Sequence, residues 1–454
     1  MPTTIPPAHV TDEAQRSGST PSTDAIDERV QASHTGSRIT KRPAFSTGLG
    51  FVGGFWVAVG GWAVVCGVLI AASYRQLAGI GGFWDDRLTL GAEHSLGAWW
   101  SGGLLLTAGL LALATAEATR SLPAEPAARR RLARAFRVLG FWLAVLCIDE
   151  WASLHERYDW SDIVIPRELR LPPIALAMAA TVGWAFWTMW RQRGALGSGL
   201  ATFLIAAGFG SMGSIYGIEL AEHAVVWPEG WRPARLAFEE GLELFGMGLV
   251  LFAVAWHWIG QASTPARRAD TVARAAVVAG VGLLCVAPLL ILLQHLMPLE
   301  GKWARMGVPG KAVPPMLLLV AAATAWFAFL RGGEGRRIWL VAAIVALLAC
   351  VEAMTSLSAW FVEVPVNRMR MDFVLLAAGV GIAAIGLIAK RGLWVAAGLV
   401  AVALNAIGFV AFKNPVMQLA ATLGAGVLLA ALAWSATARG GATGSPTKPE
   451  PAAR

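Results

Sequence analysis

Charge is scarce in this chain of 454 residues, because only 15% of them are Asp, Glu, Lys or Arg. Hydrophobic residues make up 56%, above the roughly 45–50% of an average soluble domain. A composition so poor in charge excludes an intrinsically disordered protein for most of the length. The mean hydropathy of +0.58 favours a membrane protein.

Cysteine is also scarce, and the four cysteines fall in four different apolar stretches, at Cys66, Cys147, Cys285 and Cys350. None forms a CxxC pair, so the sequence predicts buried thiols and no disulfide framework. A Walker loop, a GxSxG elbow and an HExxH pair are absent from the sequence. These absences argue against the nucleotide-binding, serine hydrolase and zincin sites that are typical of soluble proteins.

Apolar runs of about 20 residues, in contrast, recur along nearly the whole chain. They predict an all-α, polytopic transmembrane helix bundle of about 12 spans. The expected spans are 51–73, 96–118, 137–156, 173–190, 198–226, 236–259, 275–297, 316–330, 338–357, 373–389, 393–412 and 416–436.

Composition divides the chain into four parts. Residues 1–45 are rich in Pro, Ser, Thr and charge and predict a disordered cytoplasmic tail, and residues 437–454 predict a second one. Residues 46–260 form a six-span half that carries most of the intramembrane charge. Residues 261–436 form a six-span half dominated by Ala, Val, Leu and Gly.

Basic residues are distributed asymmetrically about these spans. With the N-terminus inside, 24 of the 37 Lys and Arg residues lie on the inner side, whereas 18 of the 29 acids lie outside or at outer helix ends. The positive-inside rule then predicts an inner (plasma) membrane protein with both termini cytoplasmic. The net charge of +8 reflects inner arginines facing anionic lipid, so the expected partner is the bilayer and not nucleic acid.

Ten ionisable side chains gather at the outer ends of the third, fifth and sixth spans, where an ionisable group costs roughly 2.5 to 3.5 kcal/mol at bilayer depth. They therefore mark a candidate site. The third span carries a pair of acids one turn or more below the surface, and then two residues that are also typical of an interface: Asp149, Glu150, His155 and Glu156.

On the fifth span, four residues share about 120° of helical arc: Tyr216, Glu219, Glu222 and His223. A carboxylate and an imidazole at i and i+4 suit zinc, iron or manganese, although a hydrogen-bonded pair at the membrane surface is the alternative.

The sixth span begins with Glu239, Glu240 and Glu243, which repel one another unless a cation or protons neutralise them. Arg235 stands four residues before Glu239, and a salt bridge there accounts for one of the three acids. Glu93, upstream of the second span, is an additional candidate.

Two further polar residues have structural interpretations. Glu117 stands three residues before Arg120, which predicts a local salt bridge. His257 lies between Trp256 and Trp258 and predicts an aromatic belt at the inner membrane interface.

Three blocks occur together in the first half. They are Glu93 with Trp100 and Ser101 as E(x6)WS, DE(x4)HE at 149–156, and EE(x2)E at 239–243. In this order, over about residues 75 to 260, the chain resembles a group of uncharacterised bacterial polytopic integral membrane proteins. The resemblance implies a shared site and brings no known activity.

Three functions fit the cluster. The first is a metal-dependent enzyme acting on a lipid or another hydrophobic substrate. Its metal would be held by His155, Glu156, Glu219, Glu222, His223, Glu239, Glu240 and Glu243. Asp149 and Glu150 would be the catalytic residues, with an acid such as Glu150 as general base.

The second function is a proton- or cation-coupled secondary transporter, for which twelve spans with both termini inside is a common architecture. The third is a lipid-linked glycosyltransferase, with acids in its first outer loop. That loop is too short here for the usual elaborated one, so this function ranks last.

Overall fold

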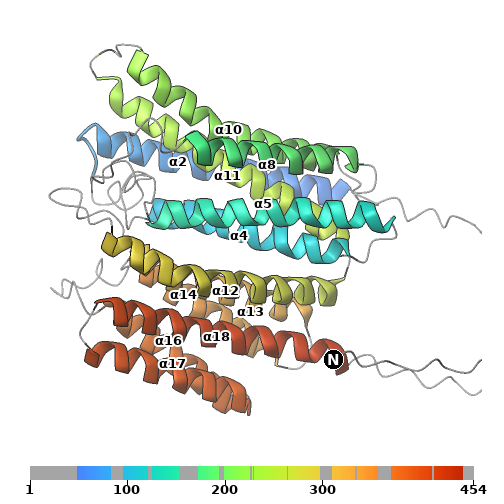
Figure 1. Cartoon of the computed structure of the whole chain (residues 1–454), viewed down its shortest axis with the longest axis vertical. Helices are drawn as coiled ribbons and strands as arrows, with labels where there is room; N and C mark the ends of the chain where they lie inside the picture. Colours follow the sequence, from blue (N-terminus) through green and yellow to red (C-terminus); the bar gives the residue numbers. More distant parts are fainter. Residues whose placement is uncertain are drawn as a thin grey trace, which may run out of the picture. The chain divides into compact units, whose positions relative to one another are not determined.

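The computed structural model describes residues 49–82, 96–120, 125–152, 172–193, 199–224, 228, 230–262, 264–296, 309–332, 335–355, 370–411 and 414–442. Within these ranges the regular structure is entirely helical (Figure 1). The twelve helices are α2 (Leu49–Leu77), α4 (Leu96–Thr119), α5 (Pro126–Ala152), α8 (Pro172–Arg191), α10 (Gly199–Ala224), α11 (Arg232–Gln261), α12 (Pro265–Leu296), α13 (Pro309–Arg331), α14 (Arg336–Thr355), α16 (Arg370–Ile388), α17 (Gly392–Ala411) and α18 (Asn414–Ala442).

Each helix coincides with one predicted apolar run, but several continue beyond it. Helix α5 begins at Pro126, about three turns before the apolar run, because its Arg, Ala and Leu residues favour helix without being apolar. Helix α18 ends at Ala442, inside the segment that the sequence predicts as a tail. Hydropathy therefore locates the part of a helix that suits a bilayer and not the ends of the helix.

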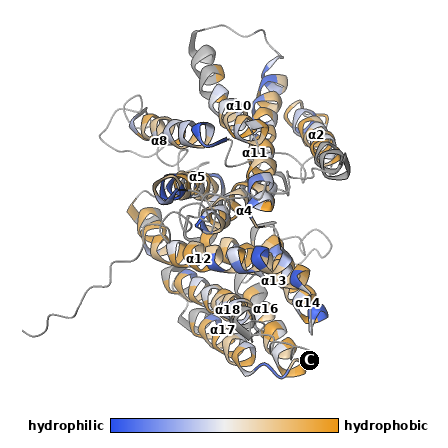
Figure 2. Ribbon diagram, turned by 90° about the vertical axis from the view of Figure 1, so that its right-hand side faces the viewer, coloured by the Kyte–Doolittle hydropathy of each residue, from blue (hydrophilic) through white to orange (hydrophobic). Residues whose placement is uncertain are grey.

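Seven helices of the described chain, α2, α4, α8, α11, α12, α13 and α18, are long and apolar enough to cross a membrane. Large apolar side chains on the outside of the bundle are exposed, among them Leu289 at 64%, Ile388 at 81% and Trp434 at 70%. Exposed apolar side chains in such number are unfavourable in water and favourable in contact with lipid. The chain has the architecture of a membrane protein, with hydrophobic residues covering most helices (Figure 2).

Helix α4 has the most buried apolar segment, 78% buried compared with 17% in α8 and 28% in α2. It packs against α5, α11 and α12, whereas α11 packs against α2, α4 and α10. On the other side of α12, helices α13, α14, α16, α17 and α18 pack in successive contacts. Helices from both predicted halves belong to one compact unit, residues 49–454.

The four cysteines are free thiols, as the sequence predicts. Cys66, Cys147 and Cys350 are buried, but Cys285 is exposed, which corrects the expectation that all four are buried. Cys285 lies on α12, only 28% of whose apolar segment is buried in the bundle. An apolar residue on such a helix is as suited to the bilayer as to the protein interior.

Candidate functional site

Two polar side chains meet between α4 and α5 near one end of the bundle. The Ser101 hydroxyl donates a hydrogen bond of 2.5 Å to Glu150 Oε1, and Ser101 is only 5% exposed. Such a short O–H···O distance is typical of a hydroxyl bound to a charged carboxylate. The bond fixes the Glu150 carboxylate above the first turns of α4.

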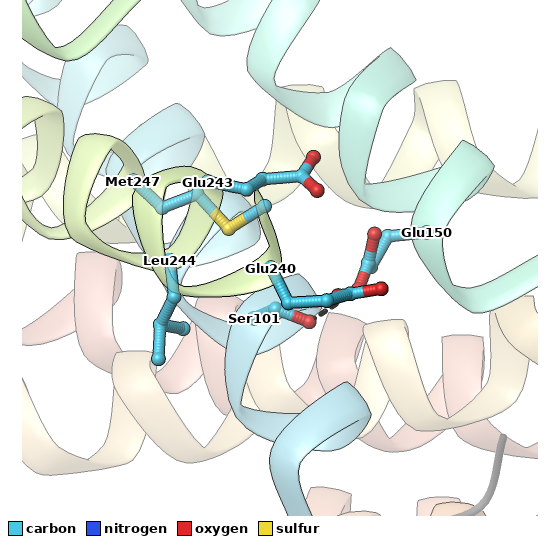
Figure 3. A pocket seen from close by; sticks show the side chains of 6 residues that line it. All are labelled: Ser101, Glu150, Glu240, Glu243, Leu244 and Met247. Atoms are coloured by element: carbon cyan, nitrogen blue, oxygen red, sulfur yellow. Dashed lines mark hydrogen bonds between the residues drawn. The ribbon is translucent and has the colours of Figure 1, made fainter. Parts of the chain in front are cut away.

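Helix α11 contributes two more carboxylates to this point. Glu240 and Glu243 line a pocket together with Ser101, Glu150, Leu244 and Met247. Glu240 and Glu243 are three residues apart and therefore lie on the same side of α11. Figure 3 shows the carboxyl ends of Glu240 and Glu150 directed toward one another, with the Glu243 carboxyl group on the same side of the pocket.

The pocket is small. Its volume is about 190 Å³ including the part open to solvent, and the enclosed part holds roughly one water molecule. Its six lining residues comprise three acids, one hydroxyl and two apolar side chains, with no basic residue. Three carboxylates brought to one small pocket repel one another when all are charged, so a bound proton or cation lowers the energy of this arrangement.

Close packing of α4 against α5 brings Ser101 and Glu150 together. Gly102, next to Ser101, lies directly under the Trp151 indole, where any Cβ atom would overlap the ring. Trp151 is in turn next to Glu150, so the contact between glycine and indole brings the serine and the acid together. On the other side, Trp100 stacks on Trp62 of α2 at 6.2 Å between ring centroids. The apolar side of the pocket itself is formed by Leu244 and Met247 of α11.

Glu239 has a different environment from its two neighbours. It is 8% exposed and pairs with Arg235, one turn earlier on α11, at 3.6 Å between Oε2 and Nη1. This confirms the salt bridge predicted for that acid. Glu239 does not line the pocket, so the three acids of the EE(x2)E block divide into one structural residue and two pocket residues.

Helix α10 crosses α11 closely and in the opposite direction. A Cβ atom on Gly246 would lie 2.6 Å from the Gly208 carbonyl oxygen, and Ser211 Oγ donates to the Leu242 carbonyl oxygen at 2.8 Å. This register places the α10 backbone at Glu219 level with about Arg235, roughly 7.5 Å along the axis from Glu240. The predicted ligands on α10 and the predicted ligands on α11 therefore begin at different levels along the bundle axis.

The side chains of Tyr216, Glu219, Glu222 and His223 are outside what the structure describes, as are Glu93, His155 and Glu156 altogether. Asp149 lies half-buried on α5 and does not line the pocket. In the described residues, no three His, Cys, Asp or Glu side chains are grouped so that they could hold a metal ion. Metal ligation by the predicted set therefore stays a prediction.

Two other sequence predictions have clear outcomes. Glu117 forms the predicted bridge to Arg120, at 2.8 Å, and a second one to Arg137 of α5, at 3.7 Å.

His257 is not part of an aromatic belt at the membrane interface, because it is 1% exposed, packs on Phe136 and lies 3.3 Å from Thr202 Oγ1. Helices α5 and α10 cover the His257 side chain. The sequence around His257 on α11 gives no sign of this burial, because the covering residues lie far away in the chain.

The sequence singled out Ser101 only as part of a block and gave it no role. Its signal was present, since a hydroxyl opens an otherwise apolar run that Leu104, Leu105 and Leu106 continue. Leu244 and Met247 carry no signal, because apolar residues on an apolar helix are the default.

Comparison with known proteins gives a family match over the part of the chain that contains the pocket residues. Residues 56–258 match the family model of a domain of unknown function, DUF8692, which contains all six pocket residues. No curated protein and no solved structure matches the chain. The chain is thus similar, over its first six described helices, to a domain of unknown function.

Proposed function

We propose that this protein is a multi-pass protein of the inner (plasma) membrane that binds a proton or a small cation between α4, α5 and α11. The supporting observation is the pocket, in which Glu150, Glu240 and Glu243 surround a space for roughly one water molecule. A space of that size suits a proton carried by water, or a small cation held by no more than two of the three carboxylates. The function that this geometry supports best is proton- or cation-coupled secondary transport.

The depth of the pocket supports the same conclusion. Glu240 lies eight residues inside the start of α11, roughly 12 Å along the helix. At that depth, the acids can be neutral when protonated or cation-bound and charged when empty, and each state favours a different packing of the three helices. Binding at the pocket is thereby coupled to conformation.

The metal-dependent enzyme is the second candidate, and the Ser101–Glu150 hydrogen bond favours it. A hydroxyl 2.5 Å from a carboxylate is an arrangement in which Glu150 acts as general base, as the sequence suggests. Oxygen ligands alone suit manganese better than zinc. A lipid or other hydrophobic substrate would approach laterally from the bilayer.

Cation binding can be tested on the purified chain. The thermal stability of the protein is measured in detergent against sodium, manganese and zinc ions, and against pH. The variant Glu240→Gln/Glu243→Gln should lose the stabilisation that the effective cation gives to the wild type. Glu125→Gln, a change of the same kind at an exposed residue before α5, should retain it. Equal responses in both variants would refute binding at the pocket.

The two candidate functions separate in proteoliposomes. A coupled transporter moves protons or cations across the bilayer when a gradient is applied, and the double pocket variant should stop this movement. Tight binding of one manganese or zinc ion without any flux would favour the enzyme over the transporter.

The arginine asymmetry supports a topology of about twelve spans with both termini cytoplasmic and the pocket facing the periplasm. Single cysteines placed near Asp162, Gly230 and Gly301, in a variant without other cysteines, should react with an impermeant maleimide in whole cells. Reaction only after lysis would reverse the orientation and place the pocket on the cytoplasmic side.

A further inference from the structure

A second polar feature lies at the opposite end of the bundle from the acidic pocket. There the beginning of α5 and the end of α8 bring five arginines to the surface: Arg130, Arg131, Arg134, Arg191 and Arg193. All five are exposed. Figure 2 looks along the helices from this end and shows hydrophilic residues on α5 and α8.

The register of the two helices places these arginines at one level. Helices α5 and α8 pack against each other in opposite directions, and Trp142 Nε1 donates to Thr181 Oγ1 at 2.7 Å (Figure 1). From that bond, Arg131 is eleven residues back on α5 and Gln192 eleven residues forward on α8, roughly 16 Å in each case. Arg131 is also within about 20° of Trp142 around α5, so it faces the seam between the helices.

Tryptophans accompany the arginines on α8. The Arg191 guanidinium lies 4.7 Å from the centroid of the Trp187 ring, and that of Arg193 lies 4.8 Å from the Trp190 ring. Trp187 is 53% exposed on the outside of the bundle. Guanidinium groups stacked on indoles are held at the level where Trp prefers to lie in a membrane, between headgroups and acyl chains.

The five arginines have no anionic partner among the residues that the structure describes. In the described part of the chain, none of them takes part in an ion pair, whereas Arg120, Arg137, Arg235 and Arg331 all do. Five positive charges within a few turns repel one another at low ionic strength unless anions come between them. Phosphate is an anion that guanidinium groups bind well, through paired N–H donors.

We infer that this arginine-rich end of α5 and α8 binds the headgroup of an anionic phospholipid, with Arg131 at the seam and with Arg191 and Arg193 on the flanks of α8, where they stack on Trp187 and Trp190. The acyl chains would lie along the outer face of α8, where Ile174, Leu176 and Trp184 are exposed. Charge complementarity and the apolar face below it together select a lipid, since a soluble phosphate uses only the first. The site lies at the opposite end of α5 from Glu150 and does not depend on the function proposed for the pocket.

The test is native mass spectrometry of the full chain, freed of its lipids and then given phosphatidylglycerol, cardiolipin or zwitterionic phosphatidylethanolamine. The wild type should retain the two anionic lipids in preference to the zwitterionic one. Arg131→Gln/Arg193→Gln should weaken this retention by roughly fivefold for each arginine removed.

Arg336→Gln/Arg337→Gln is the matched control, because these two arginines are exposed at the start of α14 and Arg336 also stacks on an aromatic ring, that of Phe329. The control should bind anionic lipid as the wild type does. An equal loss in both variants, or equal retention of anionic and zwitterionic lipid, would overturn the inference. Displacement of the lipid by millimolar glycerol phosphate would assign the arginines to soluble phosphates and overturn it as well.

Discussion

The crossing of α10 and α11 provides a sharp test of how the pocket is positioned. Substituting Gly246 by Ala would place a methyl group 2.6 Å from the Gly208 carbonyl oxygen, 3.0 Å from Met212 Cγ and 3.1 Å from Ser211 Cβ. The nearest of these atoms belongs to backbone, so it cannot move aside as the end of a side chain does. The two helices must separate by roughly 1 Å to restore van der Waals contact.

The expected cost follows from this overlap. Overpacking of a tight contact typically costs about 1–3 kcal/mol. Ala is a better helix former than Gly by about 1 kcal/mol, which offsets part of the cost. We therefore expect Gly246→Ala to reduce the free energy of unfolding by up to about 2 kcal/mol. Because α11 carries Glu240 and Glu243, we also expect weaker cation-dependent stabilisation.

The assay is reversible unfolding in mixed detergent micelles, followed by circular dichroism or tryptophan fluorescence. Gly213→Ala on α10 is the control, because a Cβ atom there would meet nothing within 4 Å. That variant should be as stable as the wild type or more stable by up to about 1 kcal/mol. If Gly246→Ala were equally stable, the close crossing of α10 and α11 would not exist in the protein.

Three further predictions use the same preparation. Gly102→Ala should destabilise the fold by about 1–3 kcal/mol and weaken cation binding, because the added methyl group displaces the Trp151 indole, whereas Gly183→Ala, with nothing within 4 Å, should do neither. N-ethylmaleimide should modify Cys285 well before the three buried cysteines, as read by mass spectrometry, and equally fast labelling of Cys147 would contradict the described burial. Glu117→Gln should change stability by no more than about 1 kcal/mol, since both of its arginine partners are largely exposed; a greater loss would show that this ion pair is shielded from water.

The sequence was a good guide to the helices of this protein. Runs of apolar residues long enough for a bilayer can satisfy their backbone only as helices, so hydropathy locates each of the twelve helices of the described chain. The predicted spans also placed Glu150, Glu240 and Glu243 near one end of the bundle. Consecutive spans run in opposite directions through a membrane, so the end of one span and the start of the next lie on the same side.

The tertiary structure decided which of these acids meet. Helix α4 brings Ser101 and Glu150 together where Gly102 admits Trp151, and it lies between α5 and α11. Arg235 engages Glu239 and so separates it from its two neighbours. These outcomes depend on the rotation of each helix about its axis and on its register with the next. Contacts between residues far apart in sequence set both, and an apolar helix in lipid has no strong facial pattern to reveal them.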